Sequence, residues 1–188
     1  MYGQNDLALP NGRFGARPRR RVDLSFGQLL NAGRWNVVGR RRGKILFEDT
    51  IDNDVVDAGL NALLGSTLTG ETQVTSWYIL VTSGAPTVAV GDTMASHAGW
   101  VEYTGVSNAT RLVWAGSRSA TASATNPTAV QYTFNATGTV GGAGLASVVS
   151  LGGSTGTLFA VGAFTAGNKL LNSGDTIDIT ATFTNTNI

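Results

Sequence analysis

The chain has 188 residues, of which 42% are hydrophobic and only 13% are charged, with 25 glycines, one histidine and no cysteine. The lack of cysteine excludes disulfides, thiol nucleophiles and cysteine-containing zinc sites formed within one chain. No apolar run approaches the roughly 18 residues that a membrane span needs, and the first residues lack the basic and apolar regions of a signal peptide. We therefore expect no membrane partner.

The net charge of +1 conceals an uneven distribution along the chain. Residues 1–48 carry ten basic and three acidic side chains, a net charge of +7, whereas residues 49–188 carry three basic and nine acidic ones, a net charge of −6. Residues 1–44 show no sustained hydrophobic period and hold too little apolar material to offset their ordering entropy. This predicts an extended basic N-terminal arm over residues 1–48 that becomes ordered on a partner.

The predicted docking residues of this arm are aromatic anchors for pockets and basic side chains for acidic groups. They are Phe14, Arg17, Arg19, Arg20, Arg21, Phe26, Trp35, Arg40, Arg41, Arg42 and Lys44. The arginines could also contact phosphates. No recognition helix, RNP motif or regular aromatic interleaving accompanies them, so a protein is favoured over nucleic acid as the partner.

Residues 49–188 are predicted to form one β-rich domain that begins with a short helix near 53–64. Acidic and amide side chains at 52–54 are suited to capping its N-terminus, and Gly65 is expected to end it in the left-handed conformation. The apolar stripe of this helix consists of Val56, Leu60, Leu63 and Leu64. Because the helix is short, it must be stabilised by packing against a sheet.

Beyond the helix the hydrophobic period changes to two, as in β-strands. Residues 75–82 have an unbroken apolar centre, which predicts a strand covered on both faces. Residues 130–135 and 177–184 alternate and predict half-buried strands. Weaker candidates are 100–103, 110–114, 138–149 and 157–164. About seven strands separated by glycine and proline turns predict an all-β sandwich, with a jelly roll favoured over immunoglobulin-like connectivity.

Two short patterns resemble ligand sites but do not meet their requirements. The segment 39–45 (GRRRGKI) has one residue too few between its glycines for a phosphate-binding loop, and Ile45 stands where magnesium needs a hydroxyl. We interpret it as part of the basic arm. The acidic cluster of Asp49, Asp52, Asp54 and Asp57 lacks the glycine and glutamate of an EF-hand, and helix capping is the favoured explanation.

No catalytic constellation is predicted either. His97 lies beside Ser96, but there is no Gly-x-Ser-x-Gly motif, and a turn histidine that bonds backbone groups is favoured. The remaining acidic residues that could serve glycoside hydrolysis mostly adjoin turn glycines and predict no pair. They are Glu71, Asp92, Glu102, Asp175 and Asp178. We therefore expect no enzymatic activity, no catalytic residue, no cofactor and no metal.

An ordered series of short motifs covers about 70% of the chain. They are 58–64 (AGLNALL), 75–78 (TSWY), 91–100 (GDTMASHAGW), 109–114 (ATRLVW), 138–143 (GTVGGA), 156–159 (GTLF) and 174–177 (GDTI). In this series residues 55–188 resemble a family of virion structural proteins of tailed bacteriophages. The resemblance implies a non-enzymatic β-rich module located in the virion and assembled in the bacterial host cytoplasm.

Two placements on the particle follow from this resemblance. The first is a capsid decoration or cement protein, a homo-trimer whose basic arm binds the major capsid protein or other virion proteins. An arm of 44 residues could reach roughly 145 Å when extended, enough to cross neighbouring subunits. The alternative is a tail-associated protein, such as a fibre-attachment, adaptor or receptor-binding module.

Overall fold

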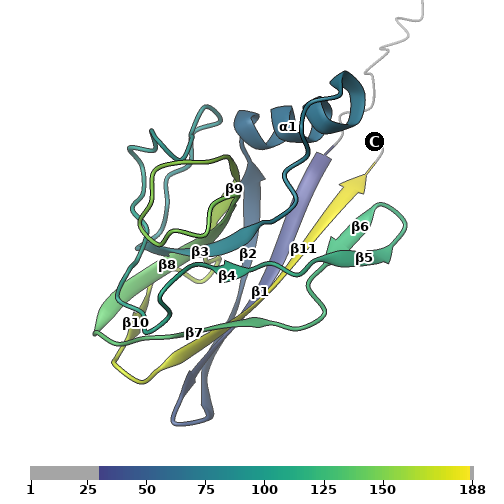
Figure 1. Ribbon diagram of the computed structural model, residues 1–188. Helices are drawn as coiled ribbons and strands as arrows, with labels where there is room; N and C mark the ends of the chain where they lie inside the picture. The colour runs from purple at the N-terminus through teal and green to yellow at the C-terminus, as the bar shows by residue number, and fades with distance from the viewer. Residues whose placement is uncertain (1–29, 187–188) are drawn as a thin grey trace, which may run out of the picture.

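A computed structural model describes residues 30–186, and these residues form the predicted all-β fold (Figure 1). Within this range eleven strands build one antiparallel sheet in the order β4-β3-β8-β9-β2-β1-β11-β6-β5, with β10 paired to β8 and β7 to β11. The strands are β1 (Leu30–Arg41), β2 (Lys44–Val55), β3 (Tyr78–Ser83), β4 (Leu112–Val113), β5 (Ser117–Ala120), β6 (Ser123–Thr125), β7 (Val130–Thr133), β8 (Gly138–Ala146), β9 (Leu158–Ala163), β10 (Lys169–Leu171) and β11 (Thr176–Thr186). Strand β2 joins the two halves of the sheet, because it pairs with β1 along most of its length and with β9 at its end.

The two longest strands, β1 and β2, occupy part of the segment predicted to be an extended arm. Strand β1 pairs with β11 from Leu30, opposite Thr186, to Arg40, opposite Thr176. The domain boundary predicted at residue 48 is therefore wrong, because the sheet already begins at Leu30. Residues 1–29, the rest of the predicted arm, lie outside the described residues.

The inward side chains of β1 explain why this segment forms a strand despite its low hydrophobicity. Trp35 and Val37 are fully buried, while Arg34 before them and Asn36 between them are exposed. This is the alternation of a strand with one buried face. Trp35 packs edge-on against Phe183 of β11, with ring centroids 5.8 Å apart.

The strands predicted with the clearest patterns are confirmed. In β3 the four residues from Ile79 to Thr82 are all buried, as expected for a strand covered on both faces. In β11 the buried residues are Ile177, Ile179 and Ala181, which alternate with half-buried ones. Tyr132 of β7 and the following Phe134 are buried in the same core.

The weaker strand candidates are borne out unevenly. Candidates 138–149 and 157–164 correspond to β8 and β9. Of the candidate 110–114, only the two residues of β4 form a strand. The candidate 100–103 is wrong, because only Glu102 forms an isolated bridge, with Thr82. The short strands β5, β6 and β10 were not predicted.

The predicted helix exists but begins later than expected. Helix α1 (Asp57–Leu64) has Val56 as its N-cap and no capping side chain, because residues 52–54 are extended within β2. Gly65 is right-handed, with φ of −58°, and the chain continues into a π-helical turn (Gly65–Thr69) that ends at the left-handed Gly70. The predicted caps and the predicted C-terminal glycine are therefore wrong.

The buried face of α1 also differs from the predicted apolar stripe. Gly59 is buried against the backbone of Phe159 in β9, since a Cβ atom on Gly59 would collide with the Phe159 carbonyl. By contrast, Leu64 is 53% exposed and Leu68 in the π-helical turn is 74% exposed. The helix thus packs on the sheet through its smallest residue and leaves part of its apolar surface uncovered by residues 30–186.

Candidate docking surfaces

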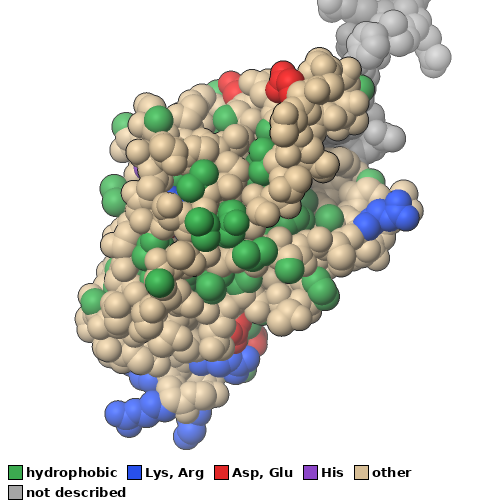
Figure 2. Space-filling view, in the orientation of Figure 1, with side chains coloured by type: hydrophobic (Ala, Val, Ile, Leu, Met, Phe, Trp, Pro, Cys, Tyr) green, Lys and Arg blue, Asp and Glu red, His purple; other side chains and the backbone are tan. Residues whose placement is uncertain are grey.

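The turn between β1 and β2 carries basic side chains at one end of the molecule (Figure 2). Arg41 pairs with Lys44, so the turn consists of Arg42 and Gly43, whose φ angles of 51° and 77° are both positive. Two positive φ angles are typical of a type I′ turn, whose twist matches that of the flanking strands. The segment interpreted as part of a basic arm is therefore a β-hairpin, which we call the basic tip (Arg40–Lys44).

Two arginines of the basic tip form ion pairs with carboxylates of β11 and of the turn before it. Arg40 Nε donates to Asp178 Oδ2 at 2.9 Å, and Arg41 donates from Nε and Nη2 to the Asp175 carboxylate at 2.9 and 2.8 Å. The bond to Asp175 raises the pKa of Arg41, and the Arg41 guanidinium holds the pKa of Asp175 below its ordinary value. Both groups therefore remain charged in the folded protein.

The other two basic residues of the tip, Arg42 and Lys44, are exposed and make no ion pair with any residue between 30 and 186. Asp178 and Asp175 form their ion pairs with Arg40 and Arg41, so they do not neutralise Arg42 and Lys44 directly. The basic tip can therefore present two positive charges to acidic groups of another molecule, on a turn held in place by two ion pairs.

The structure separates the predicted docking residues into three groups. Trp35 is a core residue with no exposed surface, so its prediction as an anchor for a partner is wrong. Arg40, Arg41, Arg42 and Lys44 lie together at the basic tip. The remaining predicted docking residues lie outside the described residues: Phe14, Arg17, Arg19, Arg20, Arg21 and Phe26.

A second surface of interest is an apolar groove of about 360 Å³ between α1 and the β5–β6 hairpin. Its floor contains Trp77, Trp114, Phe159 and Phe183, and Figure 2 shows hydrophobic side chains in this hollow. Phe183 contacts both Phe159 and Trp114 edge-on, with ring centroids 5.2 and 5.6 Å apart. The groove is large enough for apolar side chains, since small-ligand pockets measure about 300–1,000 Å³.

Sequence reasoning missed this groove. Its lining comes from α1, from the segments flanking β3 and β4, from the β5–β6 hairpin and from β8, β9 and β11. No local pattern brings such distant residues together. The one available signal was the density of aromatic residues in predicted strands, which indicates a core as readily as a groove.

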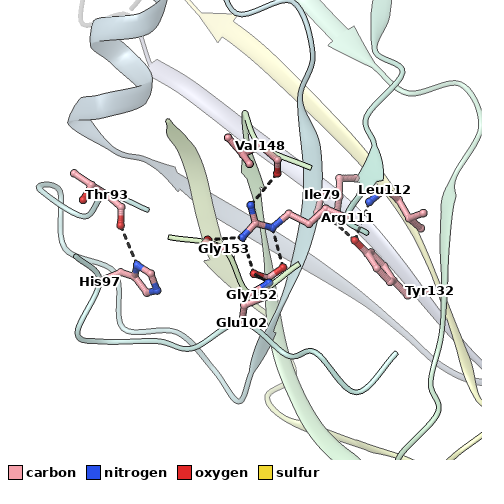
Figure 3. Close-up of polar contacts among 10 residues, drawn as sticks. All are labelled: Ile79, Thr93, His97, Glu102, Arg111, Leu112, Tyr132, Val148, Gly152 and Gly153. Atoms are coloured by element: carbon pink, nitrogen blue, oxygen red, sulfur yellow. Dashed lines mark hydrogen bonds and ion pairs between the residues drawn. The ribbon is translucent and has the colours of Figure 1, made fainter. Parts of the chain in front are cut away.

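The carboxylates considered for catalysis each have a structural partner. Glu102 receives two hydrogen bonds from the buried Arg111, from Nε at 2.9 Å and Nη2 at 2.7 Å (Figure 3). Asp92 accepts hydrogen bonds from Ala89 N and Trp100 Nε1, both at 3.2 Å. Asp175 and Asp178 hold the basic tip, and Glu71 accepts a long hydrogen bond from Thr69 Oγ1.

Arg111 also organises the surrounding loops. Its Nη1 and Nη2 donate to the carbonyl oxygens of Val148 and Gly153, both at 2.8 Å, and Glu102 accepts from Gly152 N at 2.8 Å (Figure 3). Nearby, the Tyr132 hydroxyl donates to Ile79 O at 2.6 Å and accepts from Leu112 N at 3.0 Å. Burial raises the pKa of Tyr132 far above its ordinary value, so this hydroxyl stays neutral and serves as a structural bridge.

The lone histidine has the environment predicted for it. His97 Nδ1 lies 2.9 Å from Thr93 O in the same turn (Figure 3), and its ring stacks on Trp100 with centroids 3.9 Å apart. This confirms the interpretation as a turn histidine that bonds the backbone.

The acidic residues at 49–57 do not converge on one point. Asp49 forms an ion pair with Lys169 at 2.8 Å, while Asp52 and Asp54 are exposed on β2. Partial burial works to raise the pKa of Asp49, but hydrogen bonds from Lys169, Ala166 N and Thr50 N outweigh it and lower that pKa. Among residues 30–186 there is no group of three His, Cys, Asp or Glu side chains that could hold a metal ion.

No family model matches the chain, and no curated protein matches it. The part of the chain that the structure describes contains no helix long and apolar enough to cross a membrane.

Proposed function

We propose that the chain is a structural protein of a tailed-bacteriophage virion, a decoration or cement protein that binds the outer capsid shell and stabilises it. What supports this proposal is the position of two basic elements at opposite ends of one strand. The basic tip closes the C-terminal end of β1, and the segment carrying Arg17, Arg19, Arg20 and Arg21 precedes its N-terminal end.

The length of β1 suits a bridging role. Strand β1 has 12 residues, which at about 3.3 Å per residue corresponds to roughly 40 Å. A cement protein stabilises a shell by contacting more than one neighbouring subunit, and a basic tip about 40 Å from Leu30, where the arginine-bearing segment joins the sheet, leaves room for contacts with two acidic sites. The basic tip is held by the ion pairs of Arg40 and Arg41, so the spacing between the tip and Leu30 is set by the sheet.

The proposed partners are the major capsid protein or other virion proteins. Phe14 of the N-terminal segment supplies an anchor for a pocket of the partner, and the arginines set the register on acidic groups. We further propose a homo-trimer, because three arms acting together raise the strength of attachment by avidity. The proposal includes no catalytic activity and no cofactor.

The finer fold assignment belongs to the same proposal. We favour a jelly roll over an immunoglobulin-like sandwich for the curled sheet. The supporting observation is the antiparallel pairing of the first and last strands of the described domain, β1 and β11, along nearly their whole length.

The test measures occupancy on purified particles that lack the protein. The full-length chain is compared with an arm variant, in which Arg17, Arg19, Arg20 and Arg21 are replaced by glutamine, and with a tip variant, R42Q/K44Q. We expect both to decorate the particles at lower occupancy, and the matched control Arg34→Gln, an exposed arginine between the two elements, to bind normally. Normal occupancy of both the arm and the tip variants would overturn the proposal.

Copy number distinguishes the shell from the tail. Quantitative mass spectrometry of intact virions is expected to give hundreds of copies per particle for a shell protein. A dozen copies or fewer would overturn the shell assignment and favour a fibre-attachment, adaptor or receptor-binding protein of the tail. Native mass spectrometry of the isolated protein tests the homo-trimer.

A further inference from the structure

The apolar groove lies beside the point where the chain enters the sheet. Asn31, the second residue of β1, is directly opposite Asn185 of β11, and Asn185 lines the groove. Asn185 N also donates to Ala122 O at 2.8 Å, which ties the end of β11 to the β5–β6 turn on the groove's rim. The chain preceding Leu30 therefore starts at the rim of the groove.

We propose that residues 22–29 of the same chain fill this groove. Leu24, Phe26 and Leu29 are the apolar side chains that enter it. Phe26 precedes Asn31 by five residues, a span of at most about 17 Å at roughly 3.4 Å per residue, so it is within reach of a groove whose rim includes Asn185.

Burial of apolar surface is the physical reason for this occupancy. Trp77, Trp114 and Phe183 are only partly buried by residues 30–186, and Leu63 on the groove's edge is 37% exposed. Covering aromatic and aliphatic surface of this kind is favourable in proportion to the area removed from water. The tether at Leu30 makes the contact intramolecular, which gives the segment an effective concentration in the millimolar range.

Charge complementarity determines how residues 22–29 are placed along the groove. Arg118 is the one charged residue among those that line the groove, and it makes no ion pair within residues 30–186. Residues 22–29 contain one charged side chain, Asp23, whereas residues 17–21 contain four arginines. A segment placed with Asp23 near Arg118 keeps the arginines outside the groove, since like charges repel.

The direct test is a cross-link in the full-length chain. The protein has no cysteine, so pairs of cysteines can be introduced without background. Ser25→Cys is combined with Ala122→Cys on the groove's rim and treated with a short bismaleimide. The matched control combines Ser25→Cys with Ser173→Cys, an exposed turn residue near the opposite end of β11.

We expect an intramolecular cross-link for the rim pair that does not depend on protein concentration, and a much lower yield for the control pair. A cross-link found only between chains would overturn the proposal and make a second copy the occupant. Equal yields for the rim pair and the control pair would also overturn it. The experiment needs no particle, so its failure is distinguishable from failure of the shell proposal.

A second measurement does not depend on cross-linking geometry. Trp77 and Trp114 lie in the groove, whereas Trp35 and Trp100 are buried in the core. We expect Phe26→Asp to shift tryptophan emission to the red and increase its quenching by acrylamide, while Phe14→Asp leaves both unchanged. Unchanged emission and quenching in Phe26→Asp would contradict the proposal.

The register has its own test by charge reversal. In the cross-linking pair, Arg118→Asp is expected to lower the yield a few-fold, and the added change Asp23→Arg to restore it. Failure of the second change to restore the yield would contradict the placement of Asp23 near Arg118.

Discussion

Arg41 and Asp175 form a bidentate ion pair that joins the end of β1 to the turn before β11. Arg41 Nε and Nη2 donate to Asp175 Oδ1 and Oδ2 at 2.9 and 2.8 Å. Asp175 also accepts from Asn172 N at 2.8 Å, and only 3% of its side chain is exposed. A basic residue expected to contact a partner is therefore used within the chain, to hold the basic tip against the sheet.

Replacing Asp175 by asparagine is expected to lower the midpoint of urea unfolding. The substitution keeps the size of the side chain but removes the charge that binds Arg41, and it leaves Asn172 N with a weaker acceptor. The matched control is Arg42→Gln at the neighbouring exposed turn position, which should leave the midpoint unchanged. An unaltered midpoint in Asp175→Asn would show that the pair does not contribute to stability.

Stability is also expected to fall in acid because of Asp49 and Asp175. Both have a pKa below the ordinary value of 3.8 in the folded protein. A lowered carboxyl pKa stabilises the fold fully at pH values above 3.8, and this contribution is lost as the pH falls through the lower folded-state pKa. Urea unfolding measured between pH 7 and pH 2 checks this. Asp175→Asn should show a smaller loss in acid, and an equal loss would contradict the assignment.

Truncation of Trp35 tests whether the segment 30–48 belongs to the fold. Trp35 is fully buried and packs on Phe183, so Trp35→Ala should lower the free energy of unfolding by about 3–5 kcal/mol. Arg34→Ala, an exposed neighbour on the same strand, should change it by less than about 0.5 kcal/mol. Equal effects of the two substitutions in chemical denaturation would contradict the core position of Trp35.

The strand around Trp35 shows why part of the fold escaped prediction. Two of the inward positions of β1 are Gly33 and Gly39, and both are small because a neighbour lies over them. A Cβ atom on Gly33 would collide with the Asn53 side chain, and one on Gly39 would collide with the Phe47 ring. The period of two is present in β1, but glycine does not count as a hydrophobic residue in such a pattern, so the sequence alone predicts an arm here.

The strands that could be predicted carry their pattern in large side chains. Ile177 and Ile179 of β11 and the run Ile79–Val81 of β3 occupy the buried positions that hydrophobicity alone indicates. The candidate surfaces depend instead on long-range pairing. The basic tip is held in place by Asp178 and Asp175, 138 and 134 residues away in the sequence from Arg40 and Arg41, and the groove is lined by residues from α1, the β5–β6 hairpin and several distant strands. Neither arrangement is encoded in a local spacing.

Helix α1 offers a test in which helix propensity and packing oppose each other. Alanine is the better helix former by about 1 kcal/mol, but Gly59 lies against the backbone of Phe159. Gly59→Ala should therefore be destabilising, by about 1–3 kcal/mol, since the helix must move away from β9. The control Asn61→Ala, at an exposed position of the same helix, should be neutral or slightly stabilising. A stabilised Gly59→Ala in thermal unfolding would contradict the close contact.

Removing either partner of the buried ion pair between Arg111 and Glu102 is expected to lower the free energy of unfolding. Arg111 has no exposed side-chain surface and Glu102 only 6%, so Glu102→Ala leaves a buried guanidinium without its counter-charge and should lower the free energy of unfolding by about 3–5 kcal/mol. Replacing both residues with apolar ones of similar size removes the unpaired charge. It also removes the bonds that Arg111 makes to Val148 O and Gly153 O.

The double variant Arg111→Met/Glu102→Leu should therefore recover only part of the stability lost in Glu102→Ala. Hydrogen exchange of the backbone amides near Gly152 provides the local measurement, because Gly152 N donates to Glu102 Oε2. If the ion pair holds this loop in place, we expect the Gly152 amide to exchange faster in both the single and the double variant. Full recovery of the free energy of unfolding in the double variant, together with unchanged exchange at Gly152, would contradict this role of the ion pair and leave it only a packing role in the core.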